Sequence, residues 1–235
     1  MLLKLVGSDL DADAAAALAP ALSTLTALTR LDLYDNVLEA EGAAALMPAL
    51  CHLSRLEHLS LGRNRLPAAG VAALAPALGT LTALSSLRLS GNHVGADGAA
   101  ALATCLRHLT LLADMRLVNM RFGHAGAAAL APALHHLTAL QQLHLGCNGL
   151  SDAGAEVLAP ALSRLSRLAE LHLQDNAIGE IGCLRLLTAL PPLSPLHTFD
   201  ISFNAISPTA MKAVVLNRFS ALTSLTCLGQ CVEIK

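Results

Sequence analysis

Two histidines and an aspartate recur at a fixed spacing, and their side chains are of the kind that does chemistry. His144, His172 and Asp200 follow one another at a constant 28-residue interval. Two imidazoles and a carboxylate are a ligand set that zinc accepts. Cys147 follows the first histidine closely, and a thiol beside an imidazole is the pattern of a nucleophile with its base. These residues raise two hypotheses, a metal site and a cysteine–histidine dyad.

Neither hypothesis finds further support in the sequence. No third residue is placed to orient the dyad, and nothing fixes the outer hydrogen-bond partners that metal-bound histidines need. The chain has no GxSxG or HExxH motif and no phosphate-binding glycine loop, and its six cysteines include no CxxC pair. We therefore expect exposed histidines with acidic neighbours, and we predict no enzyme, no metal site and no cofactor.

Two arginines stand at the same spacing as the histidines. Arg88 and Arg116 are separated by the same interval, so a repeating fold would place them on adjacent strands, roughly 5 Å from each other. Like charges that face each other across a sheet repel. They would form a docking point for a carboxylate or phosphate of a partner, or they would splay apart with Asp114 as counter-ion. Both alternatives stay open.

The 28-residue spacing belongs to almost the whole chain. Leu31 and Leu33 alternate with polar residues, which predicts a short half-buried strand. Leu46, Leu50 and Leu53 then fall on one face of a helix. The same pattern recurs without insertion from unit to unit. One of its leucine columns consists of Leu28, Leu56, Leu84, Leu112, Leu140, Leu168 and Leu196.

One strand and one helix cannot enclose a core, so the units must stack and bury their leucines against each other. Strands would then lie ~4.8 Å apart, whereas packed helices need ~10 Å. This mismatch predicts an α/β solenoid, curved like a horseshoe, with a parallel β-sheet on the concave face and helices on the convex face. We predict that residues 1–224 form eight leucine-rich units of this constant length and that residues 225–235 form a terminal strand, or C-terminal cap.

Asparagine follows each strand, where a side chain that both donates and accepts can satisfy a buried turn. Met120 interrupts this column. The substitution is either neutral or makes the solenoid locally flexible at this turn. Prolines form another column inside the expected helices, where we expect bends or interruptions. The asparagines are Asn36, Asn64, Asn92, Asn148, Asn176 and Asn204, and the prolines are Pro20, Pro48, Pro76, Pro132 and Pro160.

The pattern LxxLxLxxNxLxxxGxxxLxxxL resembles the ribonuclease-inhibitor-like leucine-rich repeats, and the likeness runs from residue 1 to about residue 229. The Gly-Ala-x-Ala-Leu-Ala element also resembles the shorter repeats of bacterial GALA effectors. The family includes ribonuclease inhibitors, Ran GTPase-activating proteins and the sensor tails of NOD-like receptors, so the fold does not fix the function. The resemblance implies a non-catalytic scaffold that binds a partner protein. A GTPase activator of the Ran type and an architectural repeat module of a longer protein are the alternatives.

Alternate strand positions of such a repeat face the concave surface. These columns are varied and polar while the core columns are monotonous, which is typical of a binding face on a rigid frame. Aromatic residues and arginine tend to dominate binding energy, so we expect Tyr34 and Phe203 to be exposed anchors near opposite ends. The candidate partner-binding residues are Asp32, Tyr34, Asp35, Arg63, Arg88, Arg116, His144, His172, Asp175, Asp200 and Phe203.

Composition narrows the class of partner. The formal net charge of the 235 residues is -2, which argues against nucleic acid, and no apolar run reaches the ~18 residues of a membrane span. Scattered cysteines suit a reducing, cytoplasmic location.

Residues 1–5 already match the strand positions of the repeat. An uncapped strand edge of this kind predicts a homodimer through the N-terminal strand, or a fragment of a longer protein.

Overall fold

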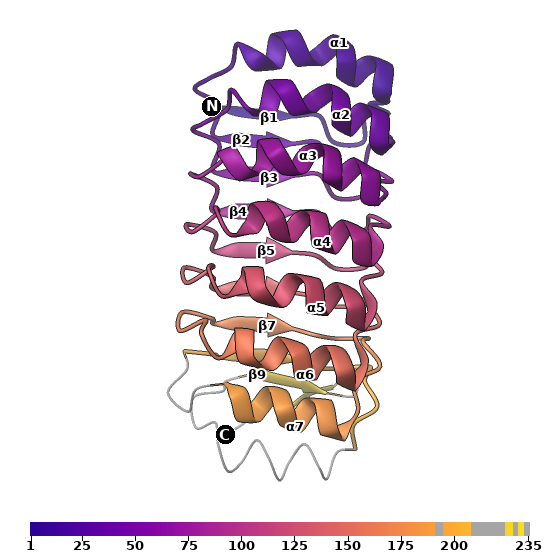
Figure 1. The fold of residues 1–235 in the computed structure, drawn as a ribbon, viewed down its shortest axis with the longest axis vertical. Helices are drawn as coiled ribbons and strands as arrows, with labels where there is room; N and C mark the ends of the chain where they lie inside the picture. The colour runs from indigo at the N-terminus through magenta and orange to yellow at the C-terminus, as the bar shows by residue number, and fades with distance from the viewer. Residues whose placement is uncertain (191–194, 208–223, 228–229, 233–235) are drawn as a thin grey trace.

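Short strands and helices alternate along the chain and stack into one arc (Figure 1). The computed structural model describes residues 1–190, 195–207, 224–227 and 230–232. The strands are β1 (Leu2–Lys4), β2 (Arg30–Asp32), β3 (His58–Ser60), β4 (Ser86–Arg88), β5 (Asp114–Arg116), β6 (Gln142–His144), β7 (Glu170–His172), β8 (Thr198–Asp200), β9 (Ser224–Cys227) and β10 (Gln230–Val232). The helices are α1 (Ala12–Ser23), α2 (Glu39–Leu50), α3 (Ala68–Thr80), α4 (Gly95–Leu106), α5 (Gly123–Leu134), α6 (Ser151–Leu162) and α7 (Glu180–Ala189).

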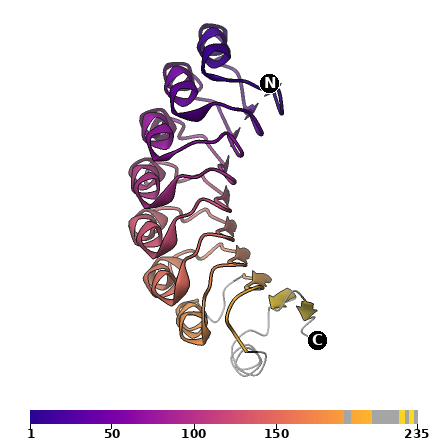
Figure 2. The ribbon, with the colours of Figure 1, turned by 90° about the vertical axis from the view of Figure 1, so that its right-hand side faces the viewer.

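The sheet keeps the strands in chain order, and β1 to β8 pair in parallel. Each residue lies opposite its counterpart in the next unit, as Leu31 lies opposite Leu59. The sheet lines the inner side of the arc and the helices form its outer side (Figure 2). The predicted α/β solenoid, with a concave parallel sheet and convex helices, is confirmed.

The core lies between the sheet and the helices and consists mostly of leucine. Leu31 and Leu33 of one strand and Leu46 and Leu50 of the following helix are all buried, and their counterparts recur in the later units. Every unit buries this set against the next one, so the apolar surface that one unit cannot cover is removed from water by its neighbours. The concave residues of the sheet are thereby held on a rigid frame.

The C-terminal end differs from the expected single strand. Strand β9 pairs in parallel with β8 but in a shifted register, as Asp200 pairs with Thr226, and β10 then pairs antiparallel with β9. An antiparallel partner needs only a short connection and covers the edge that β9 would otherwise expose. The helix expected in the eighth unit would fall in residues 208–223, outside the described residues.

The prolines do not interrupt the helices, so that part of the prediction is wrong. Helices α1, α2, α3, α5 and α6 each run through their proline. Pro20 lacks the backbone N–H that would donate one turn back, yet α1 continues through it to Ser23. Helix α4 has Thr104 at the corresponding position and also spans 12 residues. Proline at this position therefore leaves helix length unchanged.

The asparagine column satisfies the buried turns in the expected way. Asn176 Nδ2 donates to the carbonyls of Leu145 and Leu173 at 2.9 and 3.0 Å. Its Oδ1 accepts from the backbone N–H of Asn148 at 3.0 Å and of Leu150 at 3.3 Å. One side chain thus links two successive units. It provides partners for backbone N–H and C=O groups that would otherwise be buried without a hydrogen bond.

The asparagine side chains form a ladder of hydrogen bonds from unit to unit. This ladder is interrupted in the second unit, and the interruption begins in the backbone. Val37 does not adopt the left-handed conformation that Arg65 adopts at the equivalent position. The N–H of Asn36 therefore donates to the Arg63 carbonyl at 3.2 Å. The Oδ1 atom of Asn64, which would have accepted it, is buried and has no hydrogen-bond partner among the described residues.

Met120 makes a second break. Its side chain is fully buried in the asparagine position. Its own N–H donates to Asn148 Oδ1 at 2.9 Å, so the ladder continues on one side of Met120. On the other side, the methionine side chain offers no strong acceptor to the turn of Asn92 and Val94.

Replacing Met120 with asparagine is expected to raise the free energy of unfolding by about 1 kcal/mol, the net value of a hydrogen bond gained in a buried turn. The new Oδ1 would accept from the N–H groups of Asn92 and Val94. Urea unfolding measures the gain, and hydrogen exchange should slow at the Val94 amide. Met120→Leu, which adds no acceptor, is the control and should show neither effect. A destabilised Met120→Asn variant would show that methionine packing outweighs the missing hydrogen bonds.

Candidate functional site

A shallow hollow runs along the concave sheet from β1 to β6. Its volume is about 480 Å³. The strands place alternate side chains on this face because their central residues point into the core. Five of the predicted partner-binding residues line it together: Asp32, Tyr34, Arg88, Arg116 and His144.

Tyr34 forms one wall of the hollow and is half-buried, not exposed as we expected. The neighbouring unit carries Gly62 in the same column, and a Cβ atom there would lie 3.0 Å from the tyrosine ring. The absent side chain therefore leaves the space that the ring fills. Arg63 lies over the same ring, with its guanidinium carbon 5.7 Å from the ring centroid, within the range of a cation–π interaction.

Asp114 lies between the two arginines that the sequence singled out. Its Oδ2 is 2.9 Å from Arg88 Nη2, and its Oδ1 is 3.0 Å from Arg116 Nε. Ser86 Oγ also donates to Oδ2 at 3.1 Å. The arrangement is the predicted alternative in which Asp114 is the counter-ion of both arginines. Two guanidinium groups and one carboxylate leave one net positive charge at this point of the hollow.

The charge pair also sets the ionisation of Asp114. Burial pushes the pKa of the Asp114 carboxyl upward, but the hydrogen bonds and charges of Arg116 and Arg88 outweigh burial and hold that pKa below its usual value. The carboxylate thus stays charged and keeps both guanidinium groups on the concave face.

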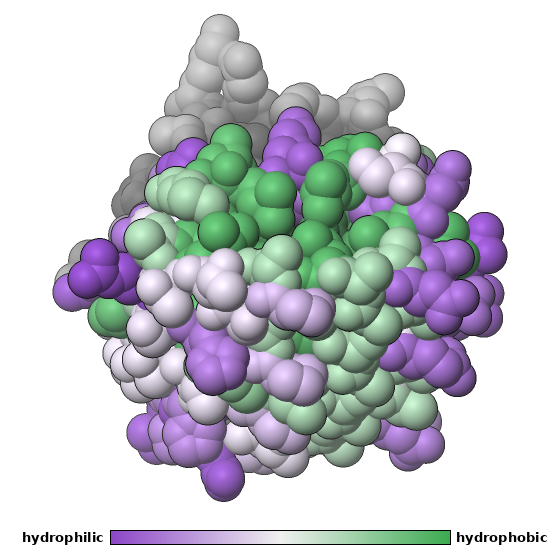
Figure 3. Space-filling view, turned by 90° about the horizontal axis from the view of Figure 1, so that it is seen from above, coloured by the Kyte–Doolittle hydropathy of each residue, from purple (hydrophilic) through white to green (hydrophobic). Residues whose placement is uncertain are grey.

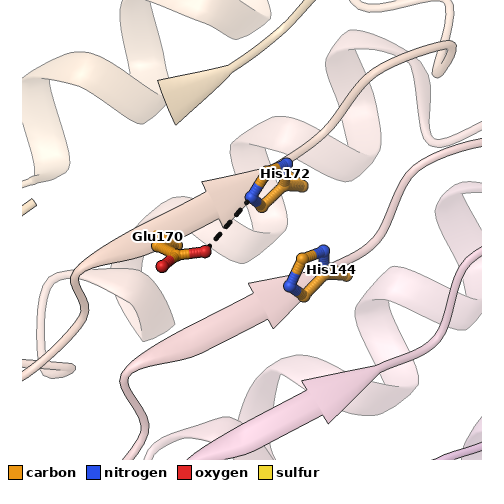
Figure 4. A group of neighbouring side chains, drawn as sticks. All are labelled: His144, Glu170 and His172. Atoms are coloured by element: carbon orange, nitrogen blue, oxygen red, sulfur yellow. Dashed lines mark ion pairs between the residues drawn. The ribbon is translucent and has the colours of Figure 1, made fainter. Parts of the chain in front are cut away.

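The two histidines lie on adjacent strands and are half-buried, which corrects the expectation of exposed side chains. Their rings stack with centroids 4.2 Å apart and an interplanar angle of 8°. Glu170, two residues before His172 on β7, lies beside the pair (Figure 4). Burial, together with the charges of His172 and Arg116, lowers the pKa of His144 to about 4. His144 is therefore a neutral imidazole at pH 7.

Asp200 extends this group on strand β8. Its Oδ2 lies 3.8 Å from Nδ1 of His172, and its Oδ1 accepts from Ser202 Oγ at 2.7 Å. Burial raises the pKa of Asp200, but the contacts with His172 and Ser202 outweigh this and lower it. His144, His172 and Asp200 thus form a row across three strands, as the spacing predicted.

The remaining candidates lie at the turns after the strands. These residues are exposed and have left-handed backbones with φ between 52° and 60°. They lie at one edge of the sheet and do not join the hollow, although Arg63 reaches Tyr34. They are Asp35, Arg63, Asp175 and Phe203.

Sequence reasoning gave Glu170 no role, although it placed the residue in a concave column. Glu170 Oε1 accepts from Gln142 Nε2 at 2.9 Å, and its Oε2 lies 3.6 Å from His172 Nε2. A carboxylate two positions before a histidine on the same strand shares its face. That alternation was the signal for the contact.

Hydrophobic side chains gather at the end of the solenoid that carries α1 and β1 (Figure 3). Met1, Leu2 and Val6 are exposed there, and β1 is the terminal strand of the described sheet. Self-association of two chains through this strand stays a prediction. Among the described residues, no helix is long and apolar enough to cross a membrane.

Comparisons with known proteins bear on the repeat. A family model described as leucine rich repeat matches residues 24–47, 80–103 and 135–159. A crystal structure of PEPR1-AtPEP1 is 22% identical over 91% of this chain, with a TM-score of 0.55. The ectodomain of the Arabidopsis receptor kinase HAESA, in complex with an N-terminal extended IDA peptide hormone ligand, is 20% identical over 87% of this chain, with a TM-score of 0.52.

This chain spans only 27% and 30% of the lengths of those two chains, so the likeness is one of fold. No curated protein matches the chain. The matched family model describes a repeat and not an enzyme. The matched segments fall in three units of one uninterrupted register of strands and helices. The chain therefore contains leucine-rich repeats and folds as a leucine-rich-repeat solenoid.

Proposed function

We propose that this protein is a non-catalytic scaffold that binds a segment of a partner protein along the hollow of its concave sheet. The observation that carries the proposal is the row of polar and aromatic side chains that successive strands present to one hollow. The hollow is shallow and open along the sheet, which suits an extended or protruding protein surface better than a small substrate that must be desolvated.

The arginine pair identifies the chemistry of one contact. Arg88 Nε and Nη2 and Arg116 Nε donate to Asp114. The other guanidinium nitrogens, Nη1 of Arg88 and both terminal nitrogens of Arg116, form no hydrogen bond to another described residue. A carboxylate of the partner would meet these donors and the net positive charge, and arginine is well suited to such contacts.

Phe203 supplies a second, separate contact. Its side chain is 70% exposed, so it gains little from burial in this chain. Its backbone has φ of 55°, a conformation that costs a bulky residue free energy and that glycine or asparagine would adopt with less strain. An exposed phenylalanine in a strained position supports a role in binding, where aromatic anchors contribute most.

One solved structure of similar fold supports a peptide or protein ligand by analogy. The HAESA ectodomain is described in complex with a peptide hormone. The likeness is too low in sequence to transfer any contact, so the proposal for this chain depends on its own concave residues.

We further assign the chain to the ribonuclease-inhibitor-like subfamily and to an intracellular, reducing location. The 28-residue unit with a helix of 10 to 13 residues supports the subfamily. Among the described cysteines, Cys51, Cys105 and Cys147 are free thiols, which supports the location.

Reversing both arginines, in the variant Arg88→Glu/Arg116→Glu, is expected to weaken partner binding at least tenfold. Partners would first be trapped with a photo-crosslinking residue placed at Ser60, on the floor of the hollow, and at Ala129 on α5 as the reference position. Affinity for a partner trapped from Ser60 is then measured for both the variant and the wild type. The loss follows because two donors become two carboxylates facing the ligand carboxylate.

The matched control is Arg164→Glu/Arg167→Glu, which reverses two exposed arginines in the turn after α6. It changes net charge equally and should leave affinity unchanged. Equal crosslinking from Ser60 and Ala129, or equal affinity of the two double variants, would contradict binding in the hollow.

A further inference from the structure

Three potential metal ligands meet on the concave face of β6 and β7. Each of His144, Glu170 and His172 offers a ligand atom, and these three atoms lie within 4.8 Å of one another. Figure 4 shows the two stacked rings on adjacent strands, with the Glu170 carboxylate next to His172. Two imidazoles and one carboxylate are a donor set that zinc uses in proteins.

The ring nitrogens of this group lack partners. Nε2 of His144 and Nε2 of His172 are both buried, and neither forms a hydrogen bond with a described residue. The 3.6 Å between His172 Nε2 and Glu170 Oε2 is too long for a hydrogen bond. Buried polar atoms are almost always paired, so two orphaned nitrogens beside a carboxylate call for an explanation. A bound cation would pair with all of them.

Two side chains stand behind the proposed ligands. Asp200 Oδ2 lies 3.8 Å from Nδ1 of His172, an electrostatic contact longer than a hydrogen bond, on the ring nitrogen opposite the one proposed to bind the metal. Gln142 Nε2 holds Oε1 of Glu170 at 2.9 Å and leaves Oε2 for a metal. A carboxylate behind a ligating histidine fixes its orientation and raises its basicity. These outer contacts were missing from the sequence argument.

We propose that His144, Glu170 and His172 bind one divalent transition-metal ion of the zinc class on the concave face. A tetrahedral ion needs its ligand atoms ~3.3 Å apart and in the plane of each imidazole, so the two stacked rings would rotate out of their parallel arrangement to share one ion. Three ligands from the chain leave a coordination position for water or a side chain of a partner. Metal binding by these three residues does not depend on whether a partner protein binds at Arg88 and Arg116.

Zinc titration of the full chain, stripped of metal with a chelator, tests the proposal by calorimetry. We expect one high-affinity ion per chain, and at least tenfold weaker binding in Glu170→Gln and in His172→Gln. The controls are His58→Gln, a half-buried histidine on the same face, and Cys147→Ser, the nearest thiol in the sequence. Both controls should bind zinc like the wild type.

Cobalt(II) provides a second readout that does not depend on the heat signal. A tetrahedral site gives visible absorption bands, which should disappear in His144→Gln. Asp200→Asn should keep the bands but bind roughly 10- to 100-fold more weakly, because it acts through His172. Absence of a one-to-one site in the wild type, or unchanged binding by His172→Gln with a native circular dichroism spectrum, would overturn the proposal.

Discussion

Replacing Asn148 with alanine is expected to lower the free energy of unfolding by about 3 kcal/mol, because several buried backbone groups lose their partner at once. Asn148 Nδ2 donates to the Leu117 and Leu145 carbonyls at 2.7 and 2.9 Å, and its Oδ1 accepts from the Met120 N–H at 2.9 Å. Met120 has no polar side chain to take over any of these contacts. Urea unfolding, followed by circular dichroism, measures the loss.

Asn64→Ala is the matched control, since Asn64 holds the same position in another unit. Its Nδ2 donates to Leu33 and Gly62, but its Oδ1 is already buried and has no hydrogen-bond partner in the described part of the chain. Truncation there removes an unsatisfied atom together with two hydrogen bonds, so the loss should be smaller by at least about 1 kcal/mol. Equal losses in the two variants would show that the ladder stabilises by side-chain volume and not by hydrogen bonding.

Acidification from pH 6.5 to pH 4 is expected to cost the folded protein about 2 kcal/mol through His144 alone, a value reduced for the solvent screening of a half-buried group. Burial, with the charges of His172 and Arg116, lowers the pKa of His144 from 6.5 to about 4. In this window the unfolded chain binds a proton that the folded chain does not. Stability therefore falls as pH falls through 6.5, and the contribution levels off near pH 4.

The variant His144→Gln should flatten this part of the stability profile, measured by urea unfolding at successive pH values in a chelator so that metal binding does not contribute. Some slope will persist, because burial and the charge of Arg30 also lower the pKa of His58. The lowered carboxyl pKa values of Asp114 and Asp200 act at more acidic pH, where their stabilising contacts are lost on protonation. His93→Gln, at an exposed position, is the control. A profile unchanged by His144→Gln would contradict a neutral, buried His144.

Several features of the concave face could be predicted because the repeat fixes them. Its constant register places Arg88 beside Arg116 and His144 beside His172, as the strand pairing has them. Because the parallel strands pair without insertions, residues that are one repeat apart in the sequence lie next to each other on adjacent strands. For the same reason, five predicted residues of one face line one hollow.

Other features depend on side chains packing across units, which no single-unit pattern contains. The burial of Tyr34 depends on Gly62 in the next unit, and the hydrogen bond that Glu170 accepts comes from Gln142 in the preceding unit. The second C-terminal strand depends on a reversal of the chain that interrupts the repeat.

The 28-residue period and the burial of its apolar columns were sufficient to predict the solenoid, its curvature and the residues that share each column, because they leave one way to stack the units. The pairing of neighbouring side chains emerged only in the folded structure. There Arg88 and Arg116 both contact Asp114, His144 stacks on His172, and Asn64 Oδ1 has no donor among the described residues. Such pairing depends on differences in distance of a few tenths of an ångström and on local backbone angles, as at Val37, and spacing along the chain does not encode these.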